Sequence, residues 1–263
     1  MKLSTMTIWA IVGVLAAPRL QAAQTPELTG NEIAAEASRR ASGFGDFSAT
    51  LRMIVRNGRG GERVRELTLK VIEIEGEGER TLVRFERPRD LRGTAFLSVS
   101  DEDGSSDQWL YLPALRRVKR IAQSSRSGSF MGTEFAYADV ATIQPDQFTH
   151  RLLRSDTLDD KPSWVVERTP LDPSSHYRRQ VVWFDQDEYR LLKVDYYDRN
   201  DTLLKTLRLS GLQLHANAFW RPGKMEMVNH RTGASTVLEW SEYVFTSGLT
   251  AVDFTPDRLR QGM

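Results

Sequence analysis

The chain has 263 residues, 40% of them apolar, which is enough for one good-sized hydrophobic core, and we expect a single domain. Its 36 basic and 35 acidic residues leave a formal net charge of +1, which disfavours nucleic acid or an anionic membrane surface as a partner. The absence of cysteine excludes disulfides and the acylated cysteine of a bacterial lipoprotein.

The start of the chain has the layout of a cleavable secretory signal, which we assign to residues 1–23. Lys2 provides a positive start, an apolar run follows, and small residues stand at Ala22 and Ala23. The apolar run is too short to span a bilayer and a proline follows it directly, which disfavours a membrane anchor or a buried first helix. We expect cleavage near Ala22 or Ala23. The mature chain, residues 24–263, is then a soluble periplasmic protein without a lipid anchor.

A helical pattern comes first in the mature chain, and an alternating pattern follows it. Thr29 and Glu32 have the S/T-x-x-E spacing of a capping box, and Gly43 supplies a stop, which predicts a helix over residues 31–42. In the next stretch, FSATLRMIVRNG, every second side chain from Phe47 is apolar and most of the others are polar. We expect a strand there, with one dry face and one wet face.

The same alternation recurs along the rest of the chain in short runs that are separated by turn residues. The turns read DEDG, DQDE, DRND and HRTG, and the segment LRSDTLDDKPS is also interpreted as a hairpin turn. This pattern is typical of an antiparallel meander and not of βαβ units. We expect a mainly β fold with few helices (α+β). It consists of one curved sheet of about ten strands, the first helix, an insert around residues 120–147 and a one-turn helix at FTPDRLR.

No arrangement typical of a catalytic or metal site occurs in the sequence. Four scattered histidines lack metal-ligand spacing, so we expect no metal and no cofactor. The string DEDGSSD at residues 101–107 is acidic enough for calcium, but it lacks the closing Glu of a calcium loop, and a hairpin turn explains it better. Nucleophile elbows and phosphate loops are also missing, so we expect no enzyme, with a hydrolase as a residual alternative.

Soft or flat apolar side chains recur on the predicted strands. Trp109 and Tyr111 share one side of a strand, and Met225 and Met227 alternate in KMEMVN. The simpler interpretation is ordinary core of a half-buried sheet, and the functional one is a dry concave wall that receives an acyl chain. On the second interpretation the wall is lined by Leu51, Met53, Leu97, Trp109, Tyr111, Trp183, Met225 and Met227.

A basic run, LPALRRVKRIAQSSR, offers a second candidate surface. A solvated outer face explains it most simply, because alternation leaves few side chains to bury. Those side chains are Leu115, Val118 and Ile121. The alternative is docking of an anionic partner surface or lipid headgroup near the mouth of a cavity, through Arg116, Arg117 and Arg120.

The stretch RSGSFMGTEFAYADV, residues 126–140, places large apolar side chains on a glycine-containing loop. One interpretation is a hydrophobic loop that packs permanently on the sheet. The other is a movable cover, with Gly128 and Gly132 as hinges. The side chains that would then fill the apolar wall in the absence of a guest are Phe130, Met131, Phe135 and Tyr137.

Residues 93–140 also carry a family resemblance. The run FLSVSDEDGSSDQWLYLPALRRVKRI, followed by SGSFMGTEFAYADV, resembles the outer membrane lipoprotein-sorting family related to LolA, in its longer branch associated with RND-type exporters. The resemblance implies an incomplete, strongly curved antiparallel β-barrel of the LolA/LolB type, with a helix or loop cover over an apolar side. It also implies a periplasmic carrier of acyl chains and an inner-membrane RND-type exporter as a candidate partner.

Two functions of different classes follow from these observations. The first is a monomeric, non-catalytic carrier or chaperone that binds acyl chains of lipoproteins or lipids and takes part in their transfer toward the outer membrane. The second is an adaptor of an RND-type exporter that carries no cargo of its own. An open apolar trough of on the order of several hundred Å³ favours the carrier, and a filled interior favours the adaptor.

Overall fold

The computed structural model describes residues 28–101 and 105–260. The predicted secretory signal at residues 1–23 therefore lies outside the described residues, as does most of the DEDG turn. Across the part of the chain that is described, no helix is both long enough and apolar enough to cross a bilayer.

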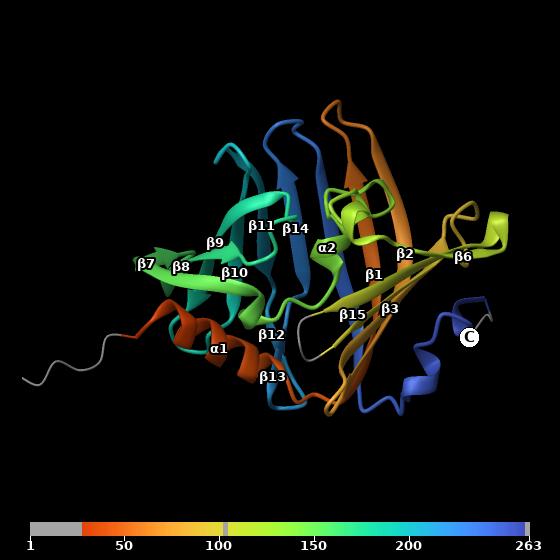
Figure 1. Cartoon of the computed structure of the whole chain (residues 1–263), viewed down its shortest axis with the longest axis horizontal. Helices are drawn as coiled ribbons and strands as arrows, with labels where there is room; N and C mark the ends of the chain where they lie inside the picture. Colours follow the sequence, from red (N-terminus) through yellow and green to blue (C-terminus); the bar gives the residue numbers. More distant parts are fainter. Residues whose placement is uncertain (1–27, 102–104, 261–263) are drawn as a thin grey trace, which may run out of the picture.

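Strands dominate the described residues, which also contain two α-helices (Figure 1). The helices are α1 (Gly30–Ala41) and α2 (Tyr137–Val140). The strands are β1 (Asp46–Arg56), β2 (Glu62–Ile74), β3 (Gly78–Arg87), β4 (Ala95–Ser100), β5 (Ser106–Leu112), β6 (Arg117–Arg120), β7 (Phe148–Leu158), β8 (Lys161–Pro170), β9 (Tyr177–Asp185), β10 (Leu191–Asp198), β11 (Leu203–Ser210), β12 (Gln213–His215), β13 (Phe219–Arg221), β14 (Lys224–Asn229) and β15 (Ser235–Phe245). Short 3₁₀ turns are η1 (Pro113–Leu115), η2 (Gln123–Ser125), η3 (Phe130–Gly132), η4 (Pro145–Gln147), η5 (Ala251–Asp253) and η6 (Arg258–Arg260).

Thirteen strands form one antiparallel sheet in the order β6-β5-β4-β3-β2-β1-β15-β14-β11-β10-β9-β8-β7, and β12 and β13 form a separate hairpin. Most neighbours in the sheet are also neighbours in sequence, which confirms the predicted meander. The pairing of β1 with β15 joins the first and last strands in the middle of the sheet. In Figure 1, β1, β2, β14 and β15 run up the view while β7 and β8 run across it, so the sheet bends strongly along its width.

The predicted helix is confirmed, as are the predicted turns that lie within the described residues. Helix α1 starts at a capping box, in which the Glu32 amide donates to Thr29 Oγ1 at 3.2 Å and the Thr29 amide donates to Glu32 Oε2 at 2.7 Å. Between β7 and β8 the turn residues Asp159 and Asp160 have φ of 50° and 62°, as a two-residue type I′ hairpin requires. The final segment forms the one-turn helix η6.

The main core lies on one face of the sheet, which we call the inner face. From β1, the side chains of Phe47, Leu51 and Met53 are buried in it, while Arg52 on the opposite, outer face pairs with Glu239 at 2.7 Å. The predicted division into a dry face and a wet face is thus confirmed at the centre of the sheet. Two smaller apolar clusters lie on the outer face, one over β2–β6 and one over β8–β10.

Residues 121–147, which we call the cover segment, connect the two end strands β6 and β7 across the inner face. In Figure 1 this segment, which includes α2, lies in front of the central strands. Helix α1 packs beside it on β7 and η4, and its Ile33 is fully buried in the main core. The inner face is therefore covered by one helix and one long, irregular segment.

Candidate functional site

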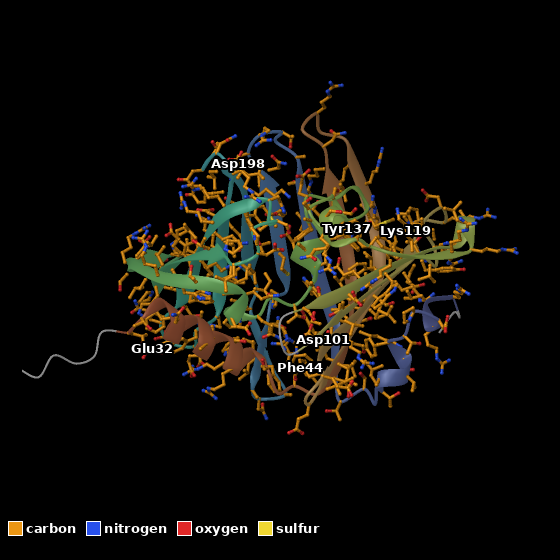
Figure 2. The ribbon with its side chains drawn as sticks, in the orientation of Figure 1. Glu32, Phe44, Asp101, Lys119, Tyr137 and Asp198 are labelled. Atoms are coloured by element: carbon orange, nitrogen blue, oxygen red, sulfur yellow. The ribbon has the colours of Figure 1, made fainter. Side chains whose placement is uncertain are left out.

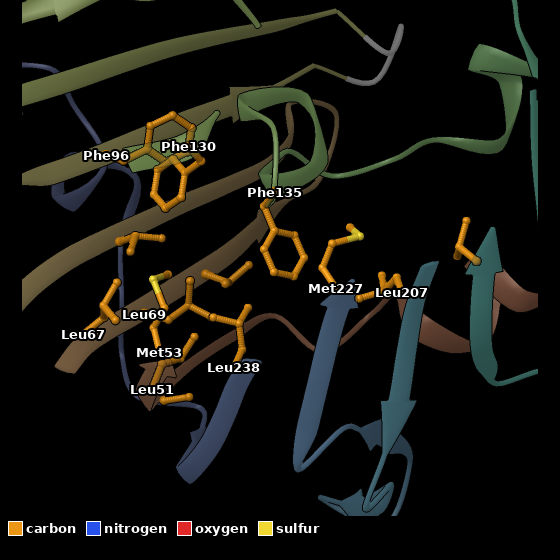
Figure 3. Packing of buried hydrophobic residues seen from close by; sticks show 14 of the residues in the cluster. Leu51, Met53, Leu67, Leu69, Phe96, Phe130, Phe135, Leu207, Met227 and Leu238 are labelled. Atoms are coloured by element: carbon orange, nitrogen blue, oxygen red, sulfur yellow. The ribbon is translucent and has the colours of Figure 1, made fainter. Parts of the chain in front are cut away.

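The cover segment inserts two phenylalanines into the inner face of the sheet. Phe130 is 2% exposed and Phe135 is 4% exposed. The Phe130 ring packs on Phe96 and Phe85, with centroid separations of 5.2 and 6.2 Å, and on Tyr137 at 5.5 Å. Figure 3 shows Phe130 beside Phe96 and Phe135 pointing toward the strands alongside Met227. The part of the inner face that a guest could use is thus filled by the protein's own aromatic rings.

A tight loop aims both phenylalanines in the same direction. The Phe130 amide donates to Phe135 O at 2.8 Å, and Thr133 Oγ1 donates to Phe130 O at 2.7 Å. Met131 and Gly132 both have left-handed backbone, with φ of 51° and 74°. Glycine adopts this conformation without cost, whereas methionine does not, so the surrounding contacts hold Met131 in place.

Polar side chains from the sheet hold the tip of the cover segment. Arg65 Nη1 donates to Met131 O at 2.8 Å, and Lys205 Nζ donates to Glu134 O at 2.6 Å. The Glu134 carboxylate accepts a hydrogen bond from Asn229 Nδ2 at 2.7 Å. The Glu134 amide donates to Thr236 Oγ1 at 3.0 Å. Strands β2, β11, β14 and β15 therefore each form one hydrogen bond that would break if the tip moved away.

Arg65 was not among the residues expected from the sequence, although a signal for it exists. It lies on β2 in phase with Leu67 and Leu69, so its side chain points to the inner face, where it is 7% exposed. Its guanidinium lies 5.9 Å from the Phe85 ring, and burial lowers the pKa of Arg65. A charged residue in phase with the apolar residues of a strand is the available signal, because a buried charge is costly unless it has a hydrogen-bond partner.

The other end of the cover segment bridges strands that lie far apart in the sheet. Asp139 Oδ2 accepts hydrogen bonds from the Ala136 amide at 2.8 Å and from the Tyr177 hydroxyl, on β9, at 3.0 Å. Gln108 Nε2, on β5, donates to Tyr137 O at 3.1 Å. Burial raises the pKa of Asp139, and the hydrogen bond from Ala136 partly offsets that rise. Helix α2 is thus fixed to both halves of the sheet.

The structure brings together half of the residues expected in the apolar wall and all four apolar residues expected in its cover, but four residues of the wall lie elsewhere. Those in or against the main core are Leu51, Met53, Phe130, Met131, Phe135, Tyr137, Met225 and Met227. Leu97, Trp109 and Tyr111 belong to the outer cluster over β2–β6, and Trp183 belongs to the outer cluster over β8–β10. Alternation correctly groups residues of one strand on one side, but it does not reveal which side faces the main core.

The expected docking arginines lie at one end of the sheet. Arg117 and Arg120 are exposed on the end strand β6, where Arg120 pairs with Asp107, and Arg116 is exposed in the turn before it. Lys119, labelled in Figure 2, lies on the same strand. Leu115, expected to be buried, is 63% exposed because it belongs to η1 and not to the strand. The docking role of these arginines stays a prediction.

The two glycines expected as hinges differ in their surroundings. Gly132 has a left-handed backbone, and a Cβ there would meet only open space. Gly128 has no such backbone, and a Cβ there would approach Ser125 O to 3.0 Å. A hinge role stays a prediction for both.

Two hollows stand out in the described part of the chain, and the cover segment lines the second of them. One, of about 600 Å³, is lined by Arg65 together with Val64, Pro88 and Leu91. The other, of about 1130 Å³, is a cleft of mixed polar and apolar lining between the two ends of the sheet. Neither is an open apolar trough on the inner face, so a guest there would have to displace the cover segment.

Comparisons with known proteins agree on the family of this fold. A family model described as "-like: Uncharacterized protein" matches residues 77–261. The chain is similar to a solved outer membrane lipoprotein-sorting protein domain from Vibrio parahaemolyticus, with 43% identity and a TM-score of 0.86, over 88% of this chain and 98% of that one. The comparison with curated proteins gave no match.

Two further solved structures resemble the chain. A DUF1329 family protein from Desulfovibrio piger is 29% identical, with a TM-score of 0.83, over 88% of this chain and 97% of that one. A LolA superfamily protein from Nitrosomonas europaea is 24% identical, with a TM-score of 0.70, over 88% of this chain and 100% of that one. At 24% identity, the similarity to the LolA superfamily protein shows a shared fold.

Proposed function

Because the chain belongs to the family of outer membrane lipoprotein-sorting protein domains and shares the fold of a LolA superfamily protein, we propose that it is a non-catalytic periplasmic carrier of acyl chains. In this proposal residues 24–263 act as one unit after removal of the secretory signal. The curved sheet forms an incomplete barrel whose inner face receives the acyl chains of a lipoprotein or lipid. The carrier takes part in their transfer toward the outer membrane.

The observation that carries this proposal is the origin of the side chains that fill the inner face. Phe130 and Phe135 come from the irregular cover segment and not from the sheet. A guest can therefore take their place without any strand pairing being broken. The cover segment would then leave the inner face when an acyl chain enters and return when it departs.

The free energies involved are compatible with this exchange. Full burial of a phenylalanine side chain contributes about 1.5–3 kcal/mol, so Phe130 and Phe135 together contribute about 3–6 kcal/mol. An acyl chain contributes about 0.8 kcal/mol per buried methylene, or about 8 kcal/mol for ten of them. The surplus of about 2–5 kcal/mol is comparable to the loss of the four hydrogen bonds that hold the tip, at about 0.5–1.5 kcal/mol each.

Extraction of lipid from protein purified from its native host tests this proposal. We expect organic extraction followed by mass spectrometry to find acyl-chain species bound to the protein, and the emptied protein to take up a fluorescent fatty acid. Protein that repeatedly contains no lipid and takes up no fatty acid would contradict the proposal. In that case the filled interior would favour the adaptor.

The adaptor is the second candidate because basic side chains are exposed on an end strand. Charge reversal at Arg116, Arg117 and Arg120 changes this surface without altering the inner face. For an adaptor, we expect the triple variant to lose binding to the exporter. For a carrier, we expect its fatty acid uptake to equal that of the wild-type protein.

A further inference from the structure

The cleft of about 1130 Å³ is built differently from the apolar inner face. One side includes Gln108 of β5 and Arg126 of the cover segment, and the other comes from the start of β9 and includes His176 and Tyr177. Helix α2, which contributes Asp139, lies between β6 and β9 in Figure 1. The volume of the cleft slightly exceeds the range for ligand pockets, about 300–1,000 Å³.

A buried amide in this cleft has an unused hydrogen-bond acceptor. Gln108 is fully buried, and its Nε2 donates to Tyr137 O at 3.1 Å. Because that bond requires the nitrogen, the orientation of the amide is fixed, and Oε1 has no partner among the described residues. An unsatisfied buried acceptor costs about 1–3 kcal/mol, so a ligand that donates to Oε1 gains that free energy.

Two more unused polar atoms line the same cleft. Arg126 Nη1 donates to Ser106 Oγ at 3.1 Å, but Arg126 Nε is buried with no partner in the described part of the chain. The His176 ring stacks on Tyr177 with 3.7 Å between centroids, and its Nε2 also has no partner there. The cleft therefore offers an acceptor, a donor and a ring nitrogen that can act as either.

The charges of the lining select among ligands. The acidic residues are Asp101, Asp107, Asp139, Asp146 and Asp172, and the arginines are Arg120 and Arg126. Even with Asp107 paired to Arg120, the surplus is acidic, which disfavours a phosphate headgroup or another anion. A peptide group supplies one N–H and one C=O, which is the pair of partners that Gln108 Oε1 and Arg126 Nε need.

We propose that this cleft binds an extended, neutral or basic polypeptide segment, the stretch of a lipoprotein that follows its acylated residue. The inference deepens the proposed function and rests on it for the identity of that polypeptide. The cover segment borders both sites, because its Phe130 lies on the inner face and its Asp139 lines the cleft. A cargo could thus place its acyl chains in one site and its polypeptide in the adjacent one.

Peptide binding to the full chain tests this inference, with fluorescence anisotropy of a labelled decapeptide of Gly, Ser and Lys as the measurement. His176→Phe keeps a ring to pack on Tyr177 and removes both nitrogens, and Arg126→Lys keeps the charge and removes Nε. We expect each change to weaken binding about fivefold to tenfold, as the loss of one hydrogen bond would. An all-Asp analogue of the peptide should bind more weakly than the Lys-containing one.

His150→Phe is the matched control. Burial lowers the pKa of His150 and His176 to about 4, so both substitutions remove a neutral ring at pH 7. His150 bonds to Asn31 at 3.2 Å and lies outside the cleft lining, so its substitution should leave peptide affinity unchanged.

The outcomes separate this inference from the proposed function. Equal peptide affinity of wild-type, His176→Phe and Arg126→Lys proteins would overturn the inference, as would glycerophosphoethanolamine competing as well as the peptide. Fatty acid uptake is measured on the same proteins and should not change with His176→Phe. Fatty acid uptake without peptide binding would support the proposed carrier function and contradict peptide binding in the cleft. Peptide binding without fatty acid uptake would contradict the carrier function.

Discussion

At the scale of single residues, Arg65 controls how firmly the cover segment is held. In Arg65→Met the hydrogen bond to Met131 O is lost, while an unbranched side chain still fills the space beside Phe85. We expect the Phe130 and Thr133 amides, which are bonded within the loop, to exchange hydrogen about tenfold faster. Hydrogen exchange with mass spectrometry measures this. Arg63→Met, an exposed change on the same strand, should have no effect.

Asp139 makes the stability of the fold depend on pH. Burial raises its pKa above 3.8, so between that value and the folded pKa the folded chain holds a proton that the unfolded chain has lost. Stability due to this group therefore falls as pH rises through that window. Asp139→Asn cannot ionise, and its one carbonyl oxygen can accept from both Ala136 and Tyr177, because both bonds go to Oδ2 in the wild-type protein.

We therefore expect Asp139→Asn to be more stable than the wild-type protein near neutral pH and equal to it at about pH 3. Urea denaturation of both proteins across this range gives the difference in unfolding free energy. A difference that does not shrink toward low pH would show that Asp139 is not the titrating group.

Some residues of the site could be predicted from local pattern alone, and others could not. Phe130 and Phe135 attract notice because they are large apolar side chains on a loop, and the structure buries both. Lys205 and Asn229 carry no such signal, since a lysine and an asparagine on strands are ordinary in sequence. Their role comes from contacts with Glu134 that are 71 and 95 residues away in the chain.

At the scale of elements, the cover segment on the inner face and the C-terminal segment on the outer face both bury a phenylalanine. In Phe130→Ala the ring that competes with the acyl chain for the inner face is removed. We expect fatty acid to bind about tenfold more tightly or better, because about 1.5–3 kcal/mol of competing burial is lost. Phe254→Ala on the outer face should cost about 3–5 kcal/mol of stability and leave that affinity unchanged. Fluorescence titration and urea denaturation measure the two effects. Equal affinities in both variants would contradict a competing cover.

The same C-terminal segment explains why the faces of β4 and β5 were not predictable. Strand spacing, the capping box and turn residues are local features, and they gave the helix, the hairpins and the meander correctly. Leu97 and Trp109 lie under Phe254 and Leu259, which are far from them in sequence. Because both faces of these strands are apolar, alternation contains no information about which face packs on the main core.

At the scale of the whole molecule, the cover segment is the only described connection between the two end strands of the sheet, and it crosses the inner face. A carrier must release the tip of this segment before an acyl chain enters. The chain contains no cysteine, so two introduced thiols can be cross-linked without interference. Glu134 and Asn229 are suitable positions because their side-chain atoms lie 2.7 Å apart, one on the cover segment and one on β14.

We expect the double variant Glu134→Cys/Asn229→Cys to take up fatty acid before treatment and at least about tenfold more slowly after reaction with a short bifunctional thiol reagent. The control pair, Arg56→Cys/Glu62→Cys, joins directly opposed residues of β1 and β2 outside the cover segment and should keep its uptake rate. Stopped-flow fluorescence gives both rates. If the locked protein loads as fast as the control, the acyl chain enters by a route that leaves the cover segment in place, and Phe130 and Phe135 are permanent core.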